Sequence, residues 1–253
     1  MSNDGKKALI NIETLELEEF TNHPQNRYAI LSHRWEEKEV SFKDWKARKC
    51  VKRPGYLTIM KFISKAAEHD LKYAWADTCC INKESSAELS GAINSMFKYY
   101  RDAAECYVYL SDLPPSCPSS NSDGTKPSTI GGISIGAEDP RESIFADSKW
   151  FTRRWMLQET IAPRTLQFFD SAWHLFGTKN VLRYIIERRT GVPKAILDGS
   201  QQLESSSIAC RALPIAFLEF DIHMPLLYGE GDAAFIRLQE VICRKTTDMS
   251  LFA

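Results

Sequence analysis

The feature that most constrains the fold of this chain is a regular alternation between short apolar runs and segments with helical periodicity. Three runs rich in aliphatic and aromatic residues are predicted to be buried strands, and they span residues 27–35, 71–81 and 105–113. Between the first two runs, apolar residues recur at helical spacing after Pro54. Between the second and third they recur from Leu89, with Ser85 or Ser86 as the N-cap. The chain therefore alternates strand, helix, strand, helix and strand.

Such an alternation predicts an α/β fold with a flavodoxin-like parallel sheet and helices on both faces. In a sheet of this kind, ligands bind beyond the carboxyl ends of the strands, near the point where the strand order reverses. The side chains that follow the strands are therefore the candidates for substrate binding. They are Ser32, His33, Arg34 and Trp35 after the first strand and Asp77 after the second.

A glutamate farther along the chain, Glu159, is a further candidate. It lies in the stretch "FADSKWFTRRWMLQETIAPRTLQFFD", residues 145–170, which predicts a helix of about three turns, a break at Pro163 and a strand. Glu159 and Trp155 are one helical turn apart and so share a face, where the indole would exclude water and strengthen the electrostatic interactions of the carboxylate. The alternative is that Glu159 is a solvated residue at the end of a surface helix.

Composition excludes several classes of function. The 253 residues are 43% hydrophobic and 26% charged, as in a globular chain with enough apolar material for a core. The net charge of -1 gives no electrostatic footprint of a nucleic-acid partner, because phosphate binding depends on clustered positive charge. No apolar run approaches the roughly 20 residues that span a bilayer, and the N-terminus lacks the pattern of a secretory signal. We therefore expect a cytoplasmic protein without a membrane span.

The cysteines and histidines do not indicate a metal site or a cofactor. The seven cysteines include no C-x-x-C pair, and none of the five histidines lies one helical turn from another. We expect the thiols to be reduced and mostly buried as small apolar side chains. One catalytic alternative stays open, a hydrolase that would use Cys79 or Cys80 with His33.

Three regions follow from these patterns. Residues 1–26 are predicted to be an N-terminal segment, residues 27–170 the α/β core, and residues 171–253 a mainly helical extension. Within the core, residues 114–143 are dense in proline, serine and glycine and poor in large apolar side chains. We expect this insertion to be disordered, since it cannot bury enough apolar area to offset the entropy of ordering.

Four blocks of the sequence resemble successive blocks of a known family. They read "YAILSHRW", "YAWADTCCINKESSAELSGAINSMFKYYRDAAECYVYLSDL", "SKWFTRRWMLQETIAPRTLQFFD" and "MPLLYGEGDAAFIRLQEVI". In this order they are similar to the fungal heterokaryon incompatibility (HET) domain. The resemblance implies an intracellular effector of fungal non-self recognition, which triggers programmed cell death when a partner or an attached sensor module activates it. It also implies self-association through the HET core. The stretch before "MPLLYGEG" is shorter than the family pattern, so we expect a shortened C-terminal half.

HET domains are in turn distantly similar to Toll/interleukin-1 receptor (TIR) domains, many of which cleave NAD with a glutamate in a short helix. That pattern often places a serine and a tryptophan shortly before the glutamate, and the residues that follow it loosely here are Ser148, Trp150, Trp155 and Glu159. The resemblance therefore implies that Glu159 is catalytic and that NAD is a substrate, with no cofactor. One carboxylate suffices, because nicotinamide leaves without a proton while the ribose develops positive charge.

The same resemblance gives roles to the other candidates. Trp35 or Trp155 would stack on the substrate, and Arg34 would lie near the pyrophosphate. His33 and Asp77 either contact the substrate or only hold the loops. The stretch "SKWFTRRW" is the candidate surface for self-association, since tryptophan and arginine are favoured at interface centres. The alternative function is a non-enzymatic interaction or assembly module of a cell-death or signalling pathway.

Overall fold

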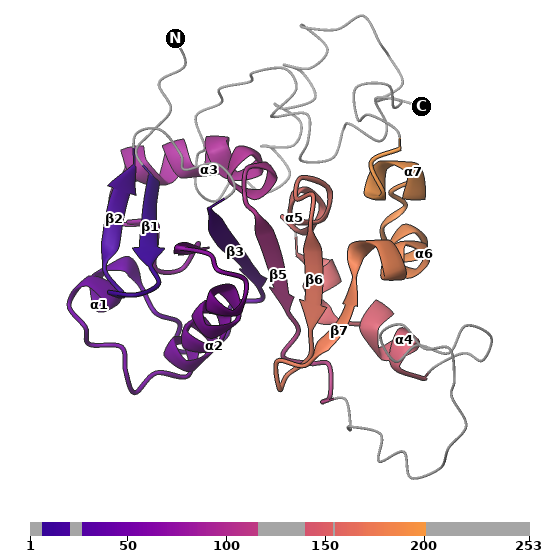
Figure 1. Ribbon diagram of the computed structural model, residues 1–253, viewed down its shortest axis with the longest axis horizontal. Coiled ribbons are helices and arrows are strands. Elements are labelled where there is room, and N and C mark those ends of the chain that lie inside the picture. The colour runs from indigo at the N-terminus through magenta and orange to yellow at the C-terminus, as the bar shows by residue number, and fades with distance from the viewer. Residues whose placement is uncertain (1–6, 21–26, 116–139, 154, 201–253) are drawn as a thin grey trace, which may run out of the picture.

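The computed structural model describes residues 7–20, 27–115, 140–153 and 155–200. The strands in these ranges are β1 Lys7–Asn11, β2 Leu17–Phe20, β3 Tyr28–His33, β4 Tyr73–Ala76, β5 Glu105–Tyr109, β6 Leu166–Phe169 and β7 Leu175–Thr178. They form one sheet in the order β2-β1-β4-β3-β5-β6-β7 (Figure 1).

The four central strands are parallel, and the strands at both edges are antiparallel to their neighbours. Numbered along the chain, the parallel strands β3, β4, β5 and β6 lie in the order 2-1-3-4, which is flavodoxin-like. The predicted α/β class is confirmed. The strand order reverses between β3 and β5, where Ala29 pairs with Glu105 and His33 with Tyr109. The carboxyl ends of these two strands are therefore the expected binding edge.

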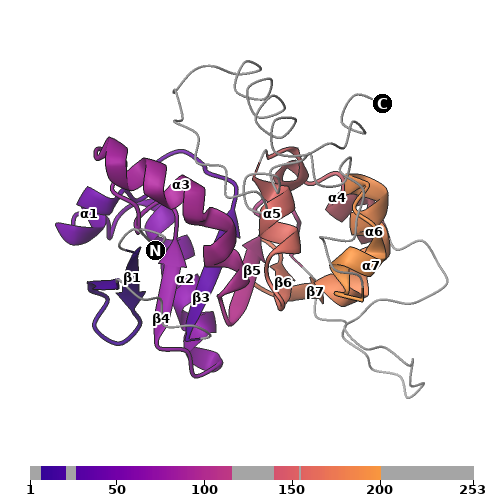
Figure 2. The same cartoon turned by 90° about the horizontal axis from the view of Figure 1, so that it is seen from above.

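Helices cover both faces of this sheet (Figures 1 and 2). They are α1 Phe42–Lys46, α2 Pro54–Glu68, α3 Ser86–Arg101, α4 Pro140–Ala146, the 3₁₀ helix η1 Lys149–Thr152, α5 Met156–Ile161, α6 Lys179–Thr190 and α7 Lys194–Leu197. The crossovers from β3 to β4 and from β4 to β5 run in opposite directions along the sheet, so right-handed connections place α2 and α3 on opposite faces. α2 packs against β3 and β4, and α5 packs beside α3.

The sequence signals for the first long elements are confirmed. α2 starts with Pro54, whose missing N–H would in any case lack a helical partner at that position. α3 is capped by Ser85 and not by Ser86, because the Ser85 hydroxyl accepts a hydrogen bond from the backbone N–H of Glu88 at 3.3 Å. All six residues of β3 are buried, as expected for a central strand covered on both faces.

The segment that carries Glu159 departs from expectation. In place of one helix of about three turns, the chain forms η1 and then the six-residue α5. Ser148 caps η1, since its hydroxyl accepts from the N–H of Trp150 at 3.3 Å, and Arg153 then takes an extended conformation with φ -78° and ψ 138°. That extended residue ends the first helical segment, so the predicted three-turn helix is wrong. The strand after Pro163 is confirmed as β6.

The described residues sample all three predicted regions. In the N-terminal segment, residues 7–20 form the β1–β2 hairpin, which extends the sheet because β1 pairs with β4. Most of the predicted insertion, residues 116–139, lies outside the described residues, as do residues 201–253, where we expect the shortened stretch. Residues 171–200 contain β7, α6 and α7. None of the helices within the described ranges is long and apolar enough to cross a bilayer.

Candidate functional site

The Glu159 carboxylate is the centre of a buried polar cluster. Arg153 Nη1 donates to Glu159 Oε2 at 2.6 Å, and Arg153 Nη2 donates to Glu159 Oε1 at 3.0 Å. The hydroxyl of Ser32 donates a further, short hydrogen bond to Oε2. Two parallel N–H···O bonds between a guanidinium and a carboxylate are the strongest common form of ion pair. Both oxygens of Glu159 are thus already bonded within the protein.

The Ser32 hydroxyl links this ion pair to an aromatic side chain. Its oxygen accepts a hydrogen bond from Trp150 Nε1 at 2.8 Å and from Arg153 Nη1 at 3.3 Å. Trp150 is 1% exposed, Ser32 1% and Glu159 3%. We call these four residues, Ser32, Trp150, Arg153 and Glu159, the Glu159 cluster. It lies at the carboxyl end of β3, where the strand order predicts a ligand site.

The electrostatics of the Glu159 cluster favour the charged form of Arg153. Burial opposes the charge on Arg153, yet the carboxylate of Glu159, with smaller contributions from Tyr100 and Asp77, raises the pKa of the guanidinium above its usual value. Burial, and then the negative charge of Glu159, raise the pKa of Tyr100 well above its usual value. Tyr100 therefore stays neutral and its hydroxyl donates to the backbone oxygen of Leu31 at 3.4 Å. The charge of Glu159 therefore influences the titration of both Arg153 and Tyr100.

A second group of predicted residues lies at the surface of the same sheet edge. Trp35 Nε1 donates to both carboxylate oxygens of Asp77, at 3.2 Å and 3.0 Å. The ammonium of Lys83 lies 3.5 Å from the centre of the Trp35 ring, a cation–π contact. Burial lowers the pKa of Lys83, which the attraction of Asp77 partly offsets. Trp35 is nevertheless 48% exposed, so the ring is fixed in orientation and open to solvent.

His33 and Arg34 differ in environment although they are adjacent. His33 is buried, and its Nε2 lies 3.2 Å from Glu39 Oε1. Burial opposes ionisation of Glu39, but the hydrogen bond and the charge of His33 together lower the pKa of that carboxyl. Arg34 is exposed. His33 therefore holds the loop after β3 through Glu39, and Arg34 is free to reach a ligand.

The geometry gives no support to a Cys–His hydrolase. Cys79 and Cys80 are buried, and each thiol contacts the backbone of Ala76. Burial raises the pKa of the Cys79 thiol well above its usual value, which disfavours the nucleophilic thiolate. His33 is engaged with Glu39. The described cysteines are free and buried, as predicted, and the described residues contain no group of His, Cys, Asp and Glu side chains placed to hold a metal ion.

The two tryptophans near Glu159 differ from expectation: Trp155 is at the surface, and Trp150 is the indole near the carboxylate. Trp155 lies at the N-cap of α5, 37% exposed, and its backbone oxygen accepts from the N–H of Glu159 at 3.2 Å. The indole that reaches the Glu159 cluster is Trp150, through Ser32. Trp150 is buried and Arg153 is bonded to Glu159, so these two side chains offer little surface to a partner, and self-association through "SKWFTRRW" stays a prediction.

Sequence reasoning placed Ser32 and Glu159 at one edge, and the structure brings them into contact. It missed the roles of Trp150, Arg153 and Lys83. The sequence carries no signal for the contact of Arg153 with Glu159, because that contact depends on the break between η1 and α5. Nothing in the sequence indicated the contact of Lys83 with Trp35.

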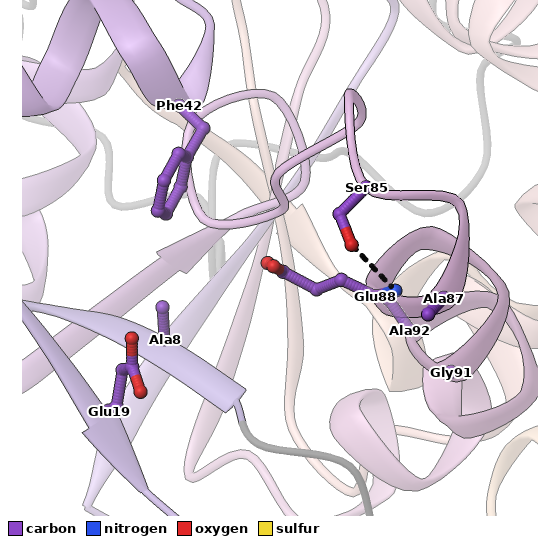
Figure 3. A pocket seen from close by; sticks show the side chains of 8 residues that line it. All are labelled: Ala8, Glu19, Phe42, Ser85, Ala87, Glu88, Gly91 and Ala92. Carbon is purple, nitrogen blue, oxygen red and sulfur yellow. Dashed lines mark hydrogen bonds between the residues drawn. The ribbon is translucent and has the colours of Figure 1, made fainter.

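A hollow of about 310 Å³ lies elsewhere in the described part of the chain, between the β1–β2 hairpin, α1 and the start of α3 (Figure 3). The residues around it are Ala8, Glu19, Phe42, Ser85, Ala87, Glu88, Gly91 and Ala92. In Figure 3 the ring of Phe42 and the carboxylates of Glu19 and Glu88 surround the space. Glu88 Oε1 also accepts from the N–H of Asn82 at 2.9 Å. This Glu88 hollow contains none of the predicted site residues.

Residues 28–159 match the family described as heterokaryon incompatibility protein (HET), a span that begins with the first residue of β3 and ends at Glu159. The vegetative incompatibility protein HET-E-1 of Podospora anserina is 41% identical over 233 residues, an alignment that covers 85% of this chain. The chain spans 16% of the length of that relative. No solved structure matches the chain.

Proposed function

This chain belongs to the heterokaryon incompatibility (HET) family, and we propose on that basis that it is an effector of fungal non-self recognition that triggers programmed cell death by cleaving NAD. The relative in Podospora anserina is named as a vegetative incompatibility protein, which supports the general role. The flavodoxin-like strand order supports the likeness to TIR domains on which the proposal of NAD cleavage rests.

The observation that carries the proposed chemistry is a buried carboxylate at the edge of the sheet where ligands bind in this class of fold. Glu159 contacts Ser32 at the carboxyl end of β3, beside the reversal of strand order. Glutamate is rarely buried unless it is paired, and buried ionisable groups concentrate at functional sites. The exposed ring of Trp35, fixed by Asp77, lies at the end of the same strand.

Cleavage of NAD suits a single carboxylate. The bond between the ribose carbon and the nicotinamide nitrogen breaks, its electron pair stays on the nitrogen, and neutral nicotinamide departs without a proton. Glu159 would hold the ribose hydroxyls and stabilise the positive charge on the ribose carbon, as carboxylates do in glycoside hydrolysis. Water then adds to that carbon and releases a proton. Trp35 and Trp155 would offer stacking surfaces and Arg34 a charge for the pyrophosphate.

The test is Glu159→Gln, which keeps the shape of the side chain and removes its charge. Nicotinamide release from NAD by concentrated protein is followed by chromatography, and toxicity is scored on overexpression. We expect both to be lost in Glu159→Gln and retained in Glu37→Gln, a control at an exposed position in the loop after β3. If Glu159→Gln matches the parent in both assays, Glu159 has no catalytic role.

The fold of the variant must be measured alongside its activity. Glu159→Gln leaves the Arg153 guanidinium without its charged partner in a buried setting, and a buried charge without a partner costs several kcal/mol. We therefore expect a lower free energy of unfolding, not an unchanged one. Both proteins are therefore assayed at a temperature where circular dichroism shows that they are folded. A loss of activity under these conditions is a loss of chemistry and not of structure.

A second function is favoured by one specific observation. Both oxygens of Glu159 are bonded to Arg153 or Ser32, and its side chain is 4% exposed, as in a purely structural ion pair. A HET domain of this kind would act as an assembly module without chemistry. A dilution series of the parent shows whether nicotinamide release needs assembly, because turnover per molecule then rises with protein concentration, whereas a module without chemistry releases no nicotinamide at any concentration. Toxicity that survives Glu159→Gln favours the non-enzymatic module.

A further inference from the structure

Both oxygens of the Glu159 carboxylate are bonded within the protein, and little of the side chain is open to a substrate. Arg153 donates to both of its oxygens, and the Ser32 hydroxyl donates to Oε2 as well. The side chain of Glu159 is 4% exposed and that of Arg153 is 16% exposed. A ribose hydroxyl can reach the carboxylate only after the guanidinium has moved away.

We propose that Arg153 is an autoinhibitory clamp, which holds Glu159 closed until the arginine swings out of the Glu159 cluster. The inference rests on the proposed cleavage of NAD and concerns the regulation of that same site. A guanidinium that bonds both oxygens of a carboxylate covers one side of it. Here its two N–H groups take both oxygens, at 2.6 Å and 3.0 Å.

Of the two partners, Glu159 is the one that is held in place. It lies within α5, and a buried lysine holds the end of this helix and the turn that follows it. Lys179 Nζ donates to the backbone oxygen of Thr160 at 3.3 Å and to that of Pro163 at 2.6 Å. The hydroxyl of Thr160 donates to the backbone oxygen of Met156 at 2.7 Å, and α5 also packs beside α3 and α7. The carboxylate is therefore presented by a rigid element.

Arg153 lies on the less constrained side of the pair. Its extended backbone follows the four-residue η1, and its backbone contacts are local. The Arg153 N–H donates to Trp150 O at 3.2 Å, and its carbonyl accepts from the N–H of Met156 at 3.3 Å. The buried rings of Trp150 and Phe151 keep η1 in place. The guanidinium can therefore leave by rotation of its own side chain, without disturbing the sheet.

The magnitude of the block follows from the burial of the pair. Breaking a buried, bidentate ion pair shifts an equilibrium constant by about two to three powers of ten. The open form of the site would then make up about 1% or less of the molecules, and the basal rate of NAD cleavage would be about 1% or less of the rate of the open form. An activator need only supply another acceptor for the guanidinium to restore the open form.

The variant that opens the clamp is Arg153→Met, which keeps much of the length of the side chain and removes its hydrogen bonds. We expect the rate of nicotinamide release at low protein concentration to rise at least about tenfold above that of the parent. Adding Glu159→Gln to the same chain should abolish the gain. Arg164→Met removes an exposed arginine close to α5 and should leave the parent's rate unchanged. Arg153→Lys, which keeps the charge and loses the second bond, should fall between parent and Arg153→Met.

The outcomes separate this inference from the proposed function. The clamp is overturned if the parent cleaves NAD through Glu159 and a folded Arg153→Met cleaves it no faster than the parent. The proposed function is then unaffected. Absence of cleavage in every folded variant overturns the proposed function, and the inhibitory role falls with it. Circular dichroism establishes which variants are folded, and Arg153→Lys provides the comparison if Arg153→Met does not fold.

A second measurement tests the clamp without NAD. A water-soluble carbodiimide couples a small amine to accessible carboxylates, and peptide mass spectrometry gives the extent of coupling at each position. Glu159 should couple slowly in the parent and at least about tenfold faster in Arg153→Met, with the exposed Glu37 as an internal standard of constant rate. Equal coupling of Glu159 in the two folded proteins would show that Arg153 does not close the site.

Discussion

The Glu159 cluster and the Glu88 hollow are opposite in construction. In the cluster, the carboxylate is 3% exposed and covered by the protein's own arginine and serine. In the hollow, the carboxylates of Glu19 and Glu88 border about 310 Å³ of space, and a Cβ added at Gly91 would meet nothing within 4 Å. The region with the predicted chemistry is therefore filled, and the region with space lacks that chemistry. A ligand can bind at the Glu159 cluster only if the Arg153 side chain moves, whereas the Glu88 hollow has space for a ligand without such a movement.

The largest change in stability is expected when the ion pair of the Glu159 cluster is broken. Arg153→Met leaves Glu159 buried without its charged partner, so the free energy of unfolding should fall by about 3–5 kcal/mol. Chemical denaturation of the parent, Arg153→Met, Glu159→Gln and the double variant gives the coupling between the two residues. The double variant should be far more stable than the sum of the single losses predicts. Additive losses would show that the ion pair contributes little to the free energy of unfolding. The Glu159 cluster would then no longer differ from the Glu88 hollow in being held together by an ion pair.

A smaller effect with a distinct pH dependence is expected behind the cluster, at Lys179. Burial lowers its pKa to about 8 from an ordinary 10.5, so between pH 8 and 10.5 the unfolded chain binds more protons at this residue than the folded chain. The Lys179 contribution to the free energy of unfolding therefore rises with pH across that window. It rises by about 1–3 kcal/mol in total, at no more than about 1.4 kcal/mol per pH unit.

Denaturation of the parent and Lys179→Met at several pH values checks this. Lys179→Met loses the hydrogen bonds to Thr160 and Pro163 but also removes the cost of burying the ammonium, so its loss of stability relative to the parent should be largest at high pH. The difference between the two proteins should widen from pH 8 upward. A difference that is constant with pH would mean that the folded and unfolded chains bind the proton equally well at Lys179.

Trp150→Phe should have a moderate effect on the same cluster. The ring keeps most of its packing in the core, but the hydrogen bond from Nε1 to Ser32 at 2.8 Å is lost. A net loss of about 0.5–1.5 kcal/mol in the free energy of unfolding is expected for one buried hydrogen bond. Trp45→Phe is the matched control for a second buried indole, since its Nε1 donates to a backbone oxygen, Leu15 O, at 3.1 Å. A loss at Trp150 well above that at Trp45 would mean that Ser32 depends on the indole for its position.

The smallest change in the free energy of unfolding is expected in the Glu88 hollow, and it is an increase. Gly91 lies within α3, where glycine is unfavourable, and its added Cβ would meet nothing. Gly91→Ala should therefore raise the free energy of unfolding by about 0.5–1 kcal/mol. Thermal unfolding of the parent and the variant measures this. A loss of stability would show that the space beside Gly91 is filled in solution, and the hollow would no longer differ from the cluster in being open.

The fold could be predicted largely from the sequence because its signals are local. The apolar runs, Pro54 and the capping serine mark elements that the structure confirms, and strand order then follows from few topological choices. Glu159 and Ser32 could be brought to one edge by that topology alone. The ion pair of Glu159 with Arg153 could not, since it depends on the extended conformation of Arg153, which divides a segment with helical periodicity. The Glu88 hollow has no sequence signal, because empty space is a property of packing.

The exposure of the tryptophans has an optical consequence. Of the six indoles in the chain, Trp45, Trp75, Trp150 and Trp173 are buried, while Trp35 and Trp155 are 48% and 37% exposed. A collisional quencher dissolved in water reaches mainly these two, and both belong to the predicted ligand edge: Trp35 follows β3 and Trp155 begins the helix of Glu159. The intrinsic fluorescence of the chain can therefore report on this edge without any added label, and its quenching by iodide, compared with and without a nucleotide, reads occupancy of that edge directly.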